Sequence, residues 1–355
     1  MHGRSTSFSI VSMGLAAVLA SACGEQPAAA RTDAPPDAVP AIAVTPAATG
    51  GLVLPIACVV GQTCQIQNYV DRDEGPASAD YRCGTRTYEA HSGVDFRLTD
   101  MRAQQAGVAV LAAADGVVAR VRDGVPDVSV AVRGLEAVSE QECGNGVVID
   151  HGEGLSTQSC HMANGSIRVR AGEPVVAGQA IGAVGLSGQS EYPHLHFTVR
   201  RGQTIVDPFS PGAAAGTCVA GTSLWGAQAA AALAYRERVV LNAGFTDAAV
   251  TMETIETGTL PVPTATAGAL VAYVRALGLK AGDVERLRVT GPGGEVLVDT
   301  TGEVVPRPQA QRLIFGGKRN RGQGWSSGVY AATYTIEAGG RTVLEHRFTY
   351  VQPAT

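Results

Sequence analysis

The sequence predicts an all-β protein with two antiparallel β-sheet domains. Two observations support this fold class. The 355 residues include 44 glycines and only 5% aromatic residues, a composition that suits many short strands joined by tight turns and suits long helices poorly. Short apolar or alternating runs recur between turn residues, without the regular alternation of strands and helices that accompanies a parallel sheet.

Residues 1–23 have the features of a lipoprotein-type signal peptide and are excluded from fold reasoning. Arg4 gives a basic start, and Phe8 to Ala20 form an apolar run too short to span a bilayer comfortably. The run ends in Leu19-Ala20-Ser21-Ala22-Cys23, which resembles a bacterial lipobox whose cysteine becomes the lipid-modified first residue. Ordinary secretion, with cleavage near the same small residues, is the alternative. No aspartate follows Cys23 directly, so the resemblance implies an exported, periplasmic protein that is lipid-anchored to the outer membrane.

Residues 24–51 consist mainly of Ala, Pro and Thr, with hardly a large apolar side chain. Such a segment cannot bury enough apolar surface to fold, so we expect a flexible tether between a lipid anchor at Cys23 and the folded domains. The formal net charge of −5 argues against a nucleic-acid partner, which normally requires a basic surface.

Residues 52–218 are dense in strand signals and form the first predicted domain. Val108 to Leu111, Ala114 to Val121 and Gln179 to Val184 are apolar or alternating runs. Two further runs flank Gly152-Glu153-Gly154, which is typical of a β-hairpin. Asp150 and His151 precede this turn, and we assign them structural roles because polar residues commonly flank turns.

Residues 219–355 form the second predicted domain. Leu224 to Arg236, centred on Ala227 to Ala234, is its one clear helix candidate, on alanine propensity alone. The rest indicates short strands separated by Gly, Pro and Asp, which suits a small immunoglobulin-like β-sandwich. No catalytic constellation is found in this domain. A structural role in docking to the cell wall or to a protein partner is compatible with the sequence, which leaves open what the domain contacts. The expected strands include Leu270–Val274, Glu285–Gly291, Glu295–Val298, Arg312–Gly316, Val329–Ile336 and Val343–Val351.

Six cysteines follow Cys23, and an even number in an exported protein suggests disulfides. None forms a Cys-x-x-Cys pair, so a structural thiolate zinc site is not expected. Sequence alone leaves many pairings open. The favoured pairs are Cys58–Cys64 as a local loop and Cys143–Cys160 across the hairpin, and Cys83–Cys218 follows by elimination.

The strongest functional signal is the pair His194 and His196 in Tyr-Pro-His-Leu-His-Phe-Thr-Val. The flanking residues alternate as in a β-strand, where side chains two residues apart share a face. The two imidazoles therefore point into the same small volume. Such a pair usually binds a metal ion, or one ring binds the metal ion while the other carries a proton. The alternative is a pair of core histidines with internal hydrogen bonds.

Residues upstream supply the other groups that a zinc hydrolase requires. His91 and Asp95 are four apart, which is about 13 Å on an extended strand and too far for both to reach one ion. The chain must therefore bend at Ser92-Gly93, where glycine permits it. With His196, this gives two imidazoles and one carboxylate around zinc and leaves the fourth position for water, as in a catalytic site. His161, at the end of a predicted strand, is a candidate to accept a proton or to hold an oxyanion.

Together these motifs resemble the lysostaphin-type (LytM-like) zinc endopeptidases, which cut peptidoglycan peptides. The resemblance covers about residues 88 to 209 and rests on His-Ser-Gly-Val-Asp-Phe, on Gln-Ser-Cys-His-Met and on His-Leu-His-Phe. Three neighbouring segments also resemble the family's strands and turns: Asp-Gly-Val-Val, Val-Val-Ile-Asp-His-Gly and Val-Gly-Leu-Ser-Gly. The chain departs from the family at Ser159-Cys160-His161-Met162, where Tyr-Ala-His-Leu is usual, and in a longer excursion from Asp123 to Cys143 that is expected to rim the groove.

The resemblance implies an antiparallel LytM-like peptidase domain with one Zn2+ per chain, bound by His91, Asp95 and His196. It also implies that His161 and His194 assist the water molecule and the transition state, and either of them can be the base. The implied function is that of a metallo-endopeptidase that hydrolyses peptide stems or cross-links of bacterial peptidoglycan. Two alternatives remain open: a non-catalytic LytM-like regulator that activates cell-wall amidases, and a zinc protease that acts on proteins.

Overall fold

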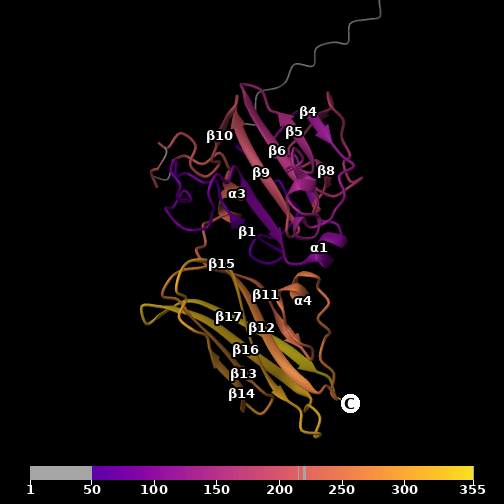
Figure 1. Cartoon of the computed structure of the whole chain (residues 1–355), viewed down its shortest axis with the longest axis vertical. Coiled ribbons are helices and arrows are strands. Elements are labelled where there is room, and N and C mark those ends of the chain that lie inside the picture. Colours follow the sequence, from indigo (N-terminus) through magenta and orange to yellow (C-terminus); the bar gives the residue numbers. More distant parts are fainter. Residues whose placement is uncertain (1–49, 215, 219–220, 355) are drawn as a thin grey trace, which may run out of the picture. The chain divides into compact units, whose positions relative to one another are not determined.

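The computed structural model describes residues 50–214, 216–218 and 221–354, and β-strands dominate it (Figure 1). All strand pairs within its sheets are antiparallel, as predicted. The predicted signal peptide, the lipidation site Cys23 and nearly all of the predicted tether lie outside the described residues. No helix within the described ranges is long and apolar enough to cross a membrane.

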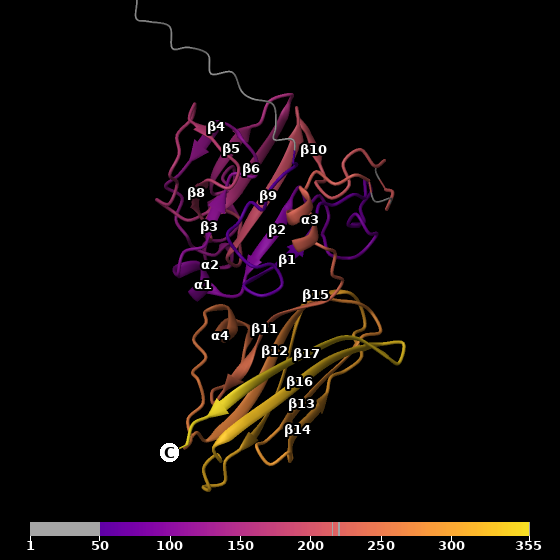
Figure 2. The same ribbon diagram turned by 180° about the vertical axis from the view of Figure 1, so that it is seen from behind.

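The first region is organised around an eight-stranded sheet with the order β1-β2-β9-β6-β5-β4-β7, in which β10 pairs with β9 (Figure 1, and from behind in Figure 2). Strands β3 and β8 form a separate two-stranded sheet. The strands of this region are β1 Cys64–Asn68, β2 Val94–Leu98, β3 Ala109–Leu111, β4 Gly116–Arg122, β5 Asn145–Asp150, β6 Leu155–Met162, β7 Pro174–Val175, β8 Ala180–Ala183, β9 His194–Arg201 and β10 Thr204–Val206.

Strand β9 shows how the sequence pattern positions the site. Leu195, Phe197 and Val199 are fully buried and belong to the hydrophobic core of this region. Because side chains alternate across a strand, His194, His196 and the residues at 198 and 200 share the opposite face. Burial of the apolar face therefore fixes the direction in which both histidines point.

One row of residues crosses four neighbouring strands of the main sheet. Asp95 of β2 lies opposite His196 of β9, and His196 lies opposite Cys160 of β6. On the other side, Asn68 of β1 lies opposite Asp95, next to an irregularity in the register of β1. The register thus brings residues from four distant parts of the chain into one line.

The C-terminal region contains a three-stranded sheet, β11-β12-β15, and a four-stranded sheet, β14-β13-β16-β17. Side chains from both sheets share one hydrophobic core. Several strands are much longer than the sequence predicted, because the glycines at 278, 316 and 317 lie within strands and do not end them. The immunoglobulin-like identity of this region stays an interpretation. Its strands are β11 Val239–Thr246, β12 Ala269–Leu279, β13 Val284–Thr290, β14 Val296–Thr301, β15 Gln309–Arg319, β16 Gly328–Ala338 and β17 Arg341–Gln352.

The helices are few and short. The expected helix is present as α3 Ala227–Ala232, and its Ala229, with Leu233 just after it, packs into the core of the first region. The sequence had placed this helix in the C-terminal domain; the domain boundary itself stays a prediction. Segments of three to five residues that show no helical periodicity were missed: α1 Met101–Gln105, α2 Val130–Arg133, the 3-10 turn Glu136–Val138 and α4 Met252–Glu256.

The three disulfides pair as predicted: Cys58 with Cys64, Cys83 with Cys218, and Cys143 with Cys160. The Cys143–Cys160 disulfide connects strand β6 with the end of the excursion that spans Asp123 to Cys143. It therefore ties that excursion to the residue directly before His161.

Candidate metal centre

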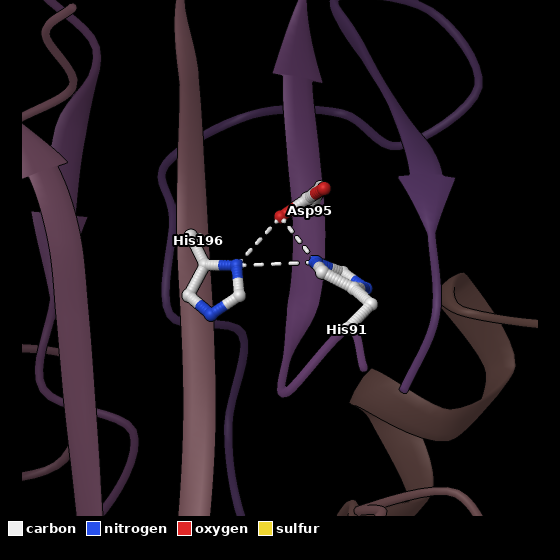
Figure 3. A group of neighbouring side chains, drawn as sticks. All are labelled: His91, Asp95 and His196. Carbon is white, nitrogen blue, oxygen red and sulfur yellow. Dashed lines mark hydrogen bonds and ion pairs between the residues drawn. The ribbon is translucent and has the colours of Figure 1, made fainter. Parts of the chain in front are cut away.

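Three potential metal ligands meet at one point of the main sheet (Figure 3). His91 lies just before β2, Asp95 lies on β2 and His196 lies on β9. Asp95 Oδ1 is 3.2 Å from His91 Nε2 and 2.9 Å from His196 Nδ1. The two ring nitrogens are 3.2 Å apart. Within the described ranges, no other group of three such residues converges in this way.

The approach of His91 to Asp95 depends on a bend at Gly93, as the sequence predicted. Gly93 does not have a positive φ, so its role is spatial and not conformational. A Cβ atom at this position would lie 2.6 Å from His196 Nε2 and 2.8 Å from the Phe197 carbonyl oxygen. Only glycine therefore lets the chain pass beside β9 while the ring of His196 occupies the site.

Hydrogen bonds orient each ligand toward the common point. His91 Nδ1 is 2.6 Å from the Tyr69 carbonyl oxygen, which can only accept, so the lone pair of Nε2 faces the centre. His196 Nε2 lies 3.0 Å from Thr198 Oγ1, which leaves Nδ1 to face Asp95. The second oxygen of Asp95 accepts a hydrogen bond from Asn68 Nδ2 at 2.9 Å.

The electrostatics of the centre favour a cation. Burial alone would raise the pKa of Asp95, but His91, His194 and hydrogen bonds from the rings hold that pKa well below 3.8. Burial opposes the charged form of His91, yet Asp95 and its hydrogen bond raise the pKa of this imidazole above 6.5. The buried carboxylate of Asp95 is thus ionised. Its negative charge stabilises a positive charge at the point where it meets the rings of His91 and His196.

The donor set fits zinc in both chemistry and spacing. Zinc binds imidazole nitrogen and carboxylate oxygen at about 2.0–2.2 Å in a tetrahedral arrangement, so neighbouring donor atoms lie roughly 3.3 Å apart. The three separations here are 2.9, 3.2 and 3.2 Å. Three protein donors also leave one corner of a tetrahedron open, as in catalytic zinc sites.

His161 and His194 lie beside this centre. Their ring centroids are 4.6 Å apart, and the His161 ring is 6.0 Å from that of His196. His194 Nε2 is 3.7 Å from Asp95 Oδ1. The structure therefore brings together all five residues that the sequence singled out as ligands or catalytic groups.

Both of these histidines are held as neutral bases. His161 Nδ1 is 2.8 Å from the Ser187 carbonyl oxygen, and His194 Nδ1 is 2.9 Å from the Tyr192 carbonyl oxygen. Because carbonyl oxygens only accept, the Nε2 atom of each ring keeps its lone pair. Burial, with His194 and His196 nearby, holds the pKa of His161 well below 6.5, and burial lowers the pKa of His194.

The backbone at His161 is also unusual, with a φ of 59°. Left-handed conformations are uncommon for residues other than glycine and persist where surrounding structure enforces them. Here the His161 N–H donates to the Cys143 carbonyl oxygen at 2.8 Å, and Cys143 is disulfide-bonded to Cys160. The disulfide thus holds the strand end that presents His161.

Asp150 and His151 lie outside this cluster. Both ring nitrogens of His151 have partners within the chain, the Asp115 carbonyl oxygen and Thr157 Oγ1, each at 2.8 Å. Asp150 Oδ1 accepts a hydrogen bond from the Gly152 N–H in the turn. These contacts support the structural roles that the sequence suggested.

Sequence reasoning missed the residues that orient the ligands. Tyr69, Ser187 and Tyr192 act through backbone carbonyl groups, which leave no trace in a side-chain pattern. Asn68 meets Asp95 only through strand pairing. Thr198 alone had a usable signal, because it continues the period-two pattern of His194 and His196.

The centre opens into a cavity of about 440 Å³. Its walls include Tyr88, Ser92, Gln158, His161, His196 and Arg200, together with the Cys143–Cys160 disulfide. The long excursion contributes Glu142 and Cys143 to this wall, which supports its expected place at the rim of the groove. The cavity therefore reaches His196 of the centre and His161 beside it.

The antiparallel sheet thus carries a converging His-Asp-His group that could hold a metal ion. Residues 89–208 match the sequence profile of Peptidase family M23. The chain carries an M23 peptidase (lysostaphin/LytM-like) domain, as its motifs predicted.

The relatives of this domain include endopeptidases, one of which is named as a peptidoglycan endopeptidase. The chain is 32% identical over 129 residues to the DD-carboxypeptidase/endopeptidase Mpg of Neisseria meningitidis, covering 35% of this chain and 23% of that protein. It is 31% identical over 122 residues to the peptidoglycan DD-endopeptidase ShyA of Vibrio cholerae, covering 34% and 23%. The chain spans between 15% and 23% of the length of the curated relatives it matches.

Among solved structures, the catalytic domain of the antimicrobial peptidase lysostaphin from Staphylococcus simulans matches with a TM-score of 0.26 at 23% sequence identity. This match covers 40% of the present chain and 85% of that structure.

Proposed function

We propose that this protein is a zinc metallo-endopeptidase that hydrolyses peptide stems or cross-links of bacterial peptidoglycan. The observation that supports it most strongly is the convergence of His91 Nε2, Asp95 Oδ1 and His196 Nδ1 within 3.2 Å of one another. The M23 domain and the endopeptidase relatives support the reaction class and the substrate.

His91, Asp95 and His196 are the residues that would hold one zinc ion. When bound, zinc supplies Lewis acidity, which polarises a carbonyl group and lowers the pKa of a water molecule to near 7. The protein keeps Asp95 ionised, and the Tyr69 carbonyl oxygen orients the Nε2 lone pair of His91 toward the site.

His161 and His194 are proposed to move the proton of the reaction. Each has a neutral ring with a lone pair at Nε2, so either Nε2 can accept a proton from the attacking water. Once protonated, the same Nε2–H can donate to the oxyanion or to the leaving amine. The carbonyl groups of Ser187 and Tyr192 fix each ring during this exchange.

Variants of the five residues test the proposal. His91→Ala, Asp95→Ala and His196→Ala are expected to lose bound zinc and activity together, because each removes one of three ligands. His161→Ala and His194→Ala are expected to keep most of the metal and to lose about 100-fold to 10,000-fold in kcat. Zinc is measured by elemental analysis, and cleavage of purified muropeptides is measured by mass spectrometry.

His346→Ala, in strand β17 of the C-terminal region, is the matched control and is expected to retain both metal and activity. Turnover by the His196 variant would contradict the ligand assignment. Zinc-loaded wild-type protein that cleaves no muropeptide would instead favour a non-catalytic role, and cleavage of unfolded proteins but not of muropeptides would favour a general protease.

We propose an exported, lipid-anchored location for this enzyme. Three disulfides support an oxidising compartment outside the cytosol. The anchor at Cys23 and the outer-membrane destination rest on the sequence motif. Incorporation of labelled fatty acid into wild-type protein, and its loss in a Cys23→Ser variant, is the direct test.

A further inference from the structure

Three arginines lie on the face of the main sheet that also presents the metal centre. Arg200 of β9 is four residues beyond His196 and so shares its face. Arg200 is half-buried, and its Nη1 donates a hydrogen bond of 2.6 Å to Gln158 Oε1 of β6. The Arg200 guanidinium therefore turns back along the sheet toward the centre, because Gln158 lies opposite Thr198.

The strand register continues this basic surface across the sheet. Gln158 lies opposite Val148 of β5, and Val148 lies opposite Arg120 of β4. Arg122 follows two residues along β4, on the same face. The cavity at the metal centre, which Arg200 lines, shares Gln158 and Cys143 with a neighbouring cavity of about 250 Å³ lined by Arg120 and Arg122. The two cavities thus form one groove, which runs from the metal centre to Arg120 and Arg122.

These arginines have no carboxylate partner within ion-pair distance in the part of the chain that the structure describes. Arg200 is bonded to a neutral amide, and Arg122 donates to the carbonyl oxygens of Gly144 and Glu140. Glu142 is the one acidic side chain lining the two cavities. Burial and the nearby charge of Arg120 lower the pKa of Arg200, as expected for two cations that lack an anion between them. The groove therefore has an excess of positive charge beside the centre.

We propose that Arg200 and Arg120 bind a free carboxylate of the substrate peptide. This inference rests on the proposed peptidase function and names the class of peptide that the site prefers. A guanidinium binds carboxylate through paired, charge-assisted hydrogen bonds, which neutral groups do not match. From the strand spacing, the bound carboxylate lies roughly 7 to 13 Å from the centre, or about two to four residues of extended peptide from the cleaved bond.

The test compares two synthetic peptides that differ in one group. Both contain the bond that mass spectrometry identifies as cleaved, and the carboxyl group nearest to it is either free or a primary amide. The zinc-loaded full chain is expected to show a kcat/KM about tenfold to a hundredfold higher for the free acid, the range expected from charged hydrogen bonds. Arg200→Gln and Arg120→Gln are expected to reduce this ratio by lowering cleavage of the acid only.

Two further variants make the comparison specific. Arg200→Lys keeps the charge but loses the paired donors, and is expected to give an intermediate ratio. Arg168→Gln removes an exposed arginine that lines neither cavity and is expected to leave the ratio unchanged. Circular dichroism of each variant shows whether it is folded.

The outcomes separate this inference from the function on which it rests. Equal cleavage of acid and amide by the wild type overturns the carboxylate site and leaves the peptidase function intact. An acid preference that persists in both glutamine variants overturns the assignment to Arg200 and Arg120. Failure to cleave either peptide or purified muropeptides overturns the proposed function together with the inference.

Discussion

At the residue scale, the proposed ligands His91 and Asp95 depend on partners outside the metal-binding motif. The Tyr69 carbonyl group fixes the tautomer of His91, and Asn68 holds the far oxygen of Asp95. Such partners usually affect metal affinity because they fix the orientation and basicity of the ligand. The two non-ligand histidines are fixed in the same way, with their neutral form favoured by burial.

The pH dependence of activity follows from His161 and His194. Only a neutral imidazole accepts a proton, and the pKa of each ring is lowered below 6.5 in the folded protein. The active neutral form therefore persists as the pH falls through 6.5 and is lost only at lower pH. We therefore expect the acidic limb of the pH profile of kcat/KM to have an apparent pKa below 6.5. The profile is measured between pH 4 and pH 9. A limb at or above 6.5, in protein that is folded and retains its zinc, would assign the acidic limb to a group other than these two histidines.

Asn68→Ala is expected to weaken zinc binding without removing a ligand. The change deletes the 2.9 Å hydrogen bond to Asp95 Oδ2 and leaves a buried carboxylate oxygen without this donor. Loss of such an outer contact typically lowers metal affinity about 10-fold to 100-fold. Competition with a chromogenic chelator measures the affinity. Gln62→Ala, at an exposed position, is the control, and equal affinities for both variants would refute a positioning role for Asn68.

At the element scale, the site is a product of strand register. Asn68, Asp95, His196 and Cys160 occupy one row across β1, β2, β9 and β6. A shift of one residue in any of these strands would turn its side chain to the opposite face. The bend at Gly93 then adds His91 to the row from outside the sheet. Added volume at Gly93 would therefore press on both the ring of His196 and the backbone of β9.

Gly93→Ala is expected to abolish metal binding and activity. The new Cβ would lie 2.6 Å from a ring atom of His196 and 2.8 Å from the Phe197 backbone, so the ring or the strand must move. Overpacking of this kind also lowers the free energy of unfolding by about 1–3 kcal/mol. Zinc content and denaturant-induced unfolding are the measurements.

Gly268→Ala is the matched control for this substitution. It has no atom within 4 Å of the added Cβ and no positive φ, so its free energy of unfolding should change by less than about 1 kcal/mol. A Gly93→Ala protein with a full complement of zinc would show that the chain beside β9 has more room than the structure indicates.

At the scale of the whole molecule, buried charges connect residues that are far apart in the sequence. Arg97 of β2 and Arg275 of β12 both form ion pairs with Glu256, at the end of α4. Only 1% of each arginine side chain is exposed, so this single carboxylate compensates two desolvated cations. Arg97 also lies two residues from Asp95, on the same face of β2.

Glu256→Gln is therefore expected to be strongly destabilising. Removal of one partner from a buried ion pair leaves uncompensated charge and typically costs about 3–5 kcal/mol. Chemical denaturation at pH 7 gives the free energy of unfolding. Glu345→Gln is the control, because its pair with Arg347 lies at the surface and should contribute less than about 1 kcal/mol. Similar losses in both variants would argue against a special role for Glu256.

Much of the site could be predicted from the sequence because its signals are local. The alternation around His194 and His196 fixes their common face, and Gly93 between His91 and Asp95 indicates the bend. Two disulfide pairs followed from loop length and the predicted hairpin, and the pair Cys83–Cys218 followed by elimination. Strand lengths in the C-terminal region were underestimated, because a glycine such as Gly316 was expected to end a strand. A glycine ends a strand only where the backbone turns, and whether the backbone turns depends on packing against other strands.

The sequence by itself predicted the antiparallel β class from composition and short alternating runs, and it predicted the five histidine and aspartate residues of the centre from periodicity, spacing and the resemblance to lysostaphin-type endopeptidases. Only the tertiary structure decided that Asn68 holds Asp95, that backbone carbonyl groups set the tautomers, and that Arg120 and Arg200 share one groove. These relations depend on strand order and register, which arise from burial of the apolar faces of many strands at once and have no counterpart in the neighbouring residues of any one strand.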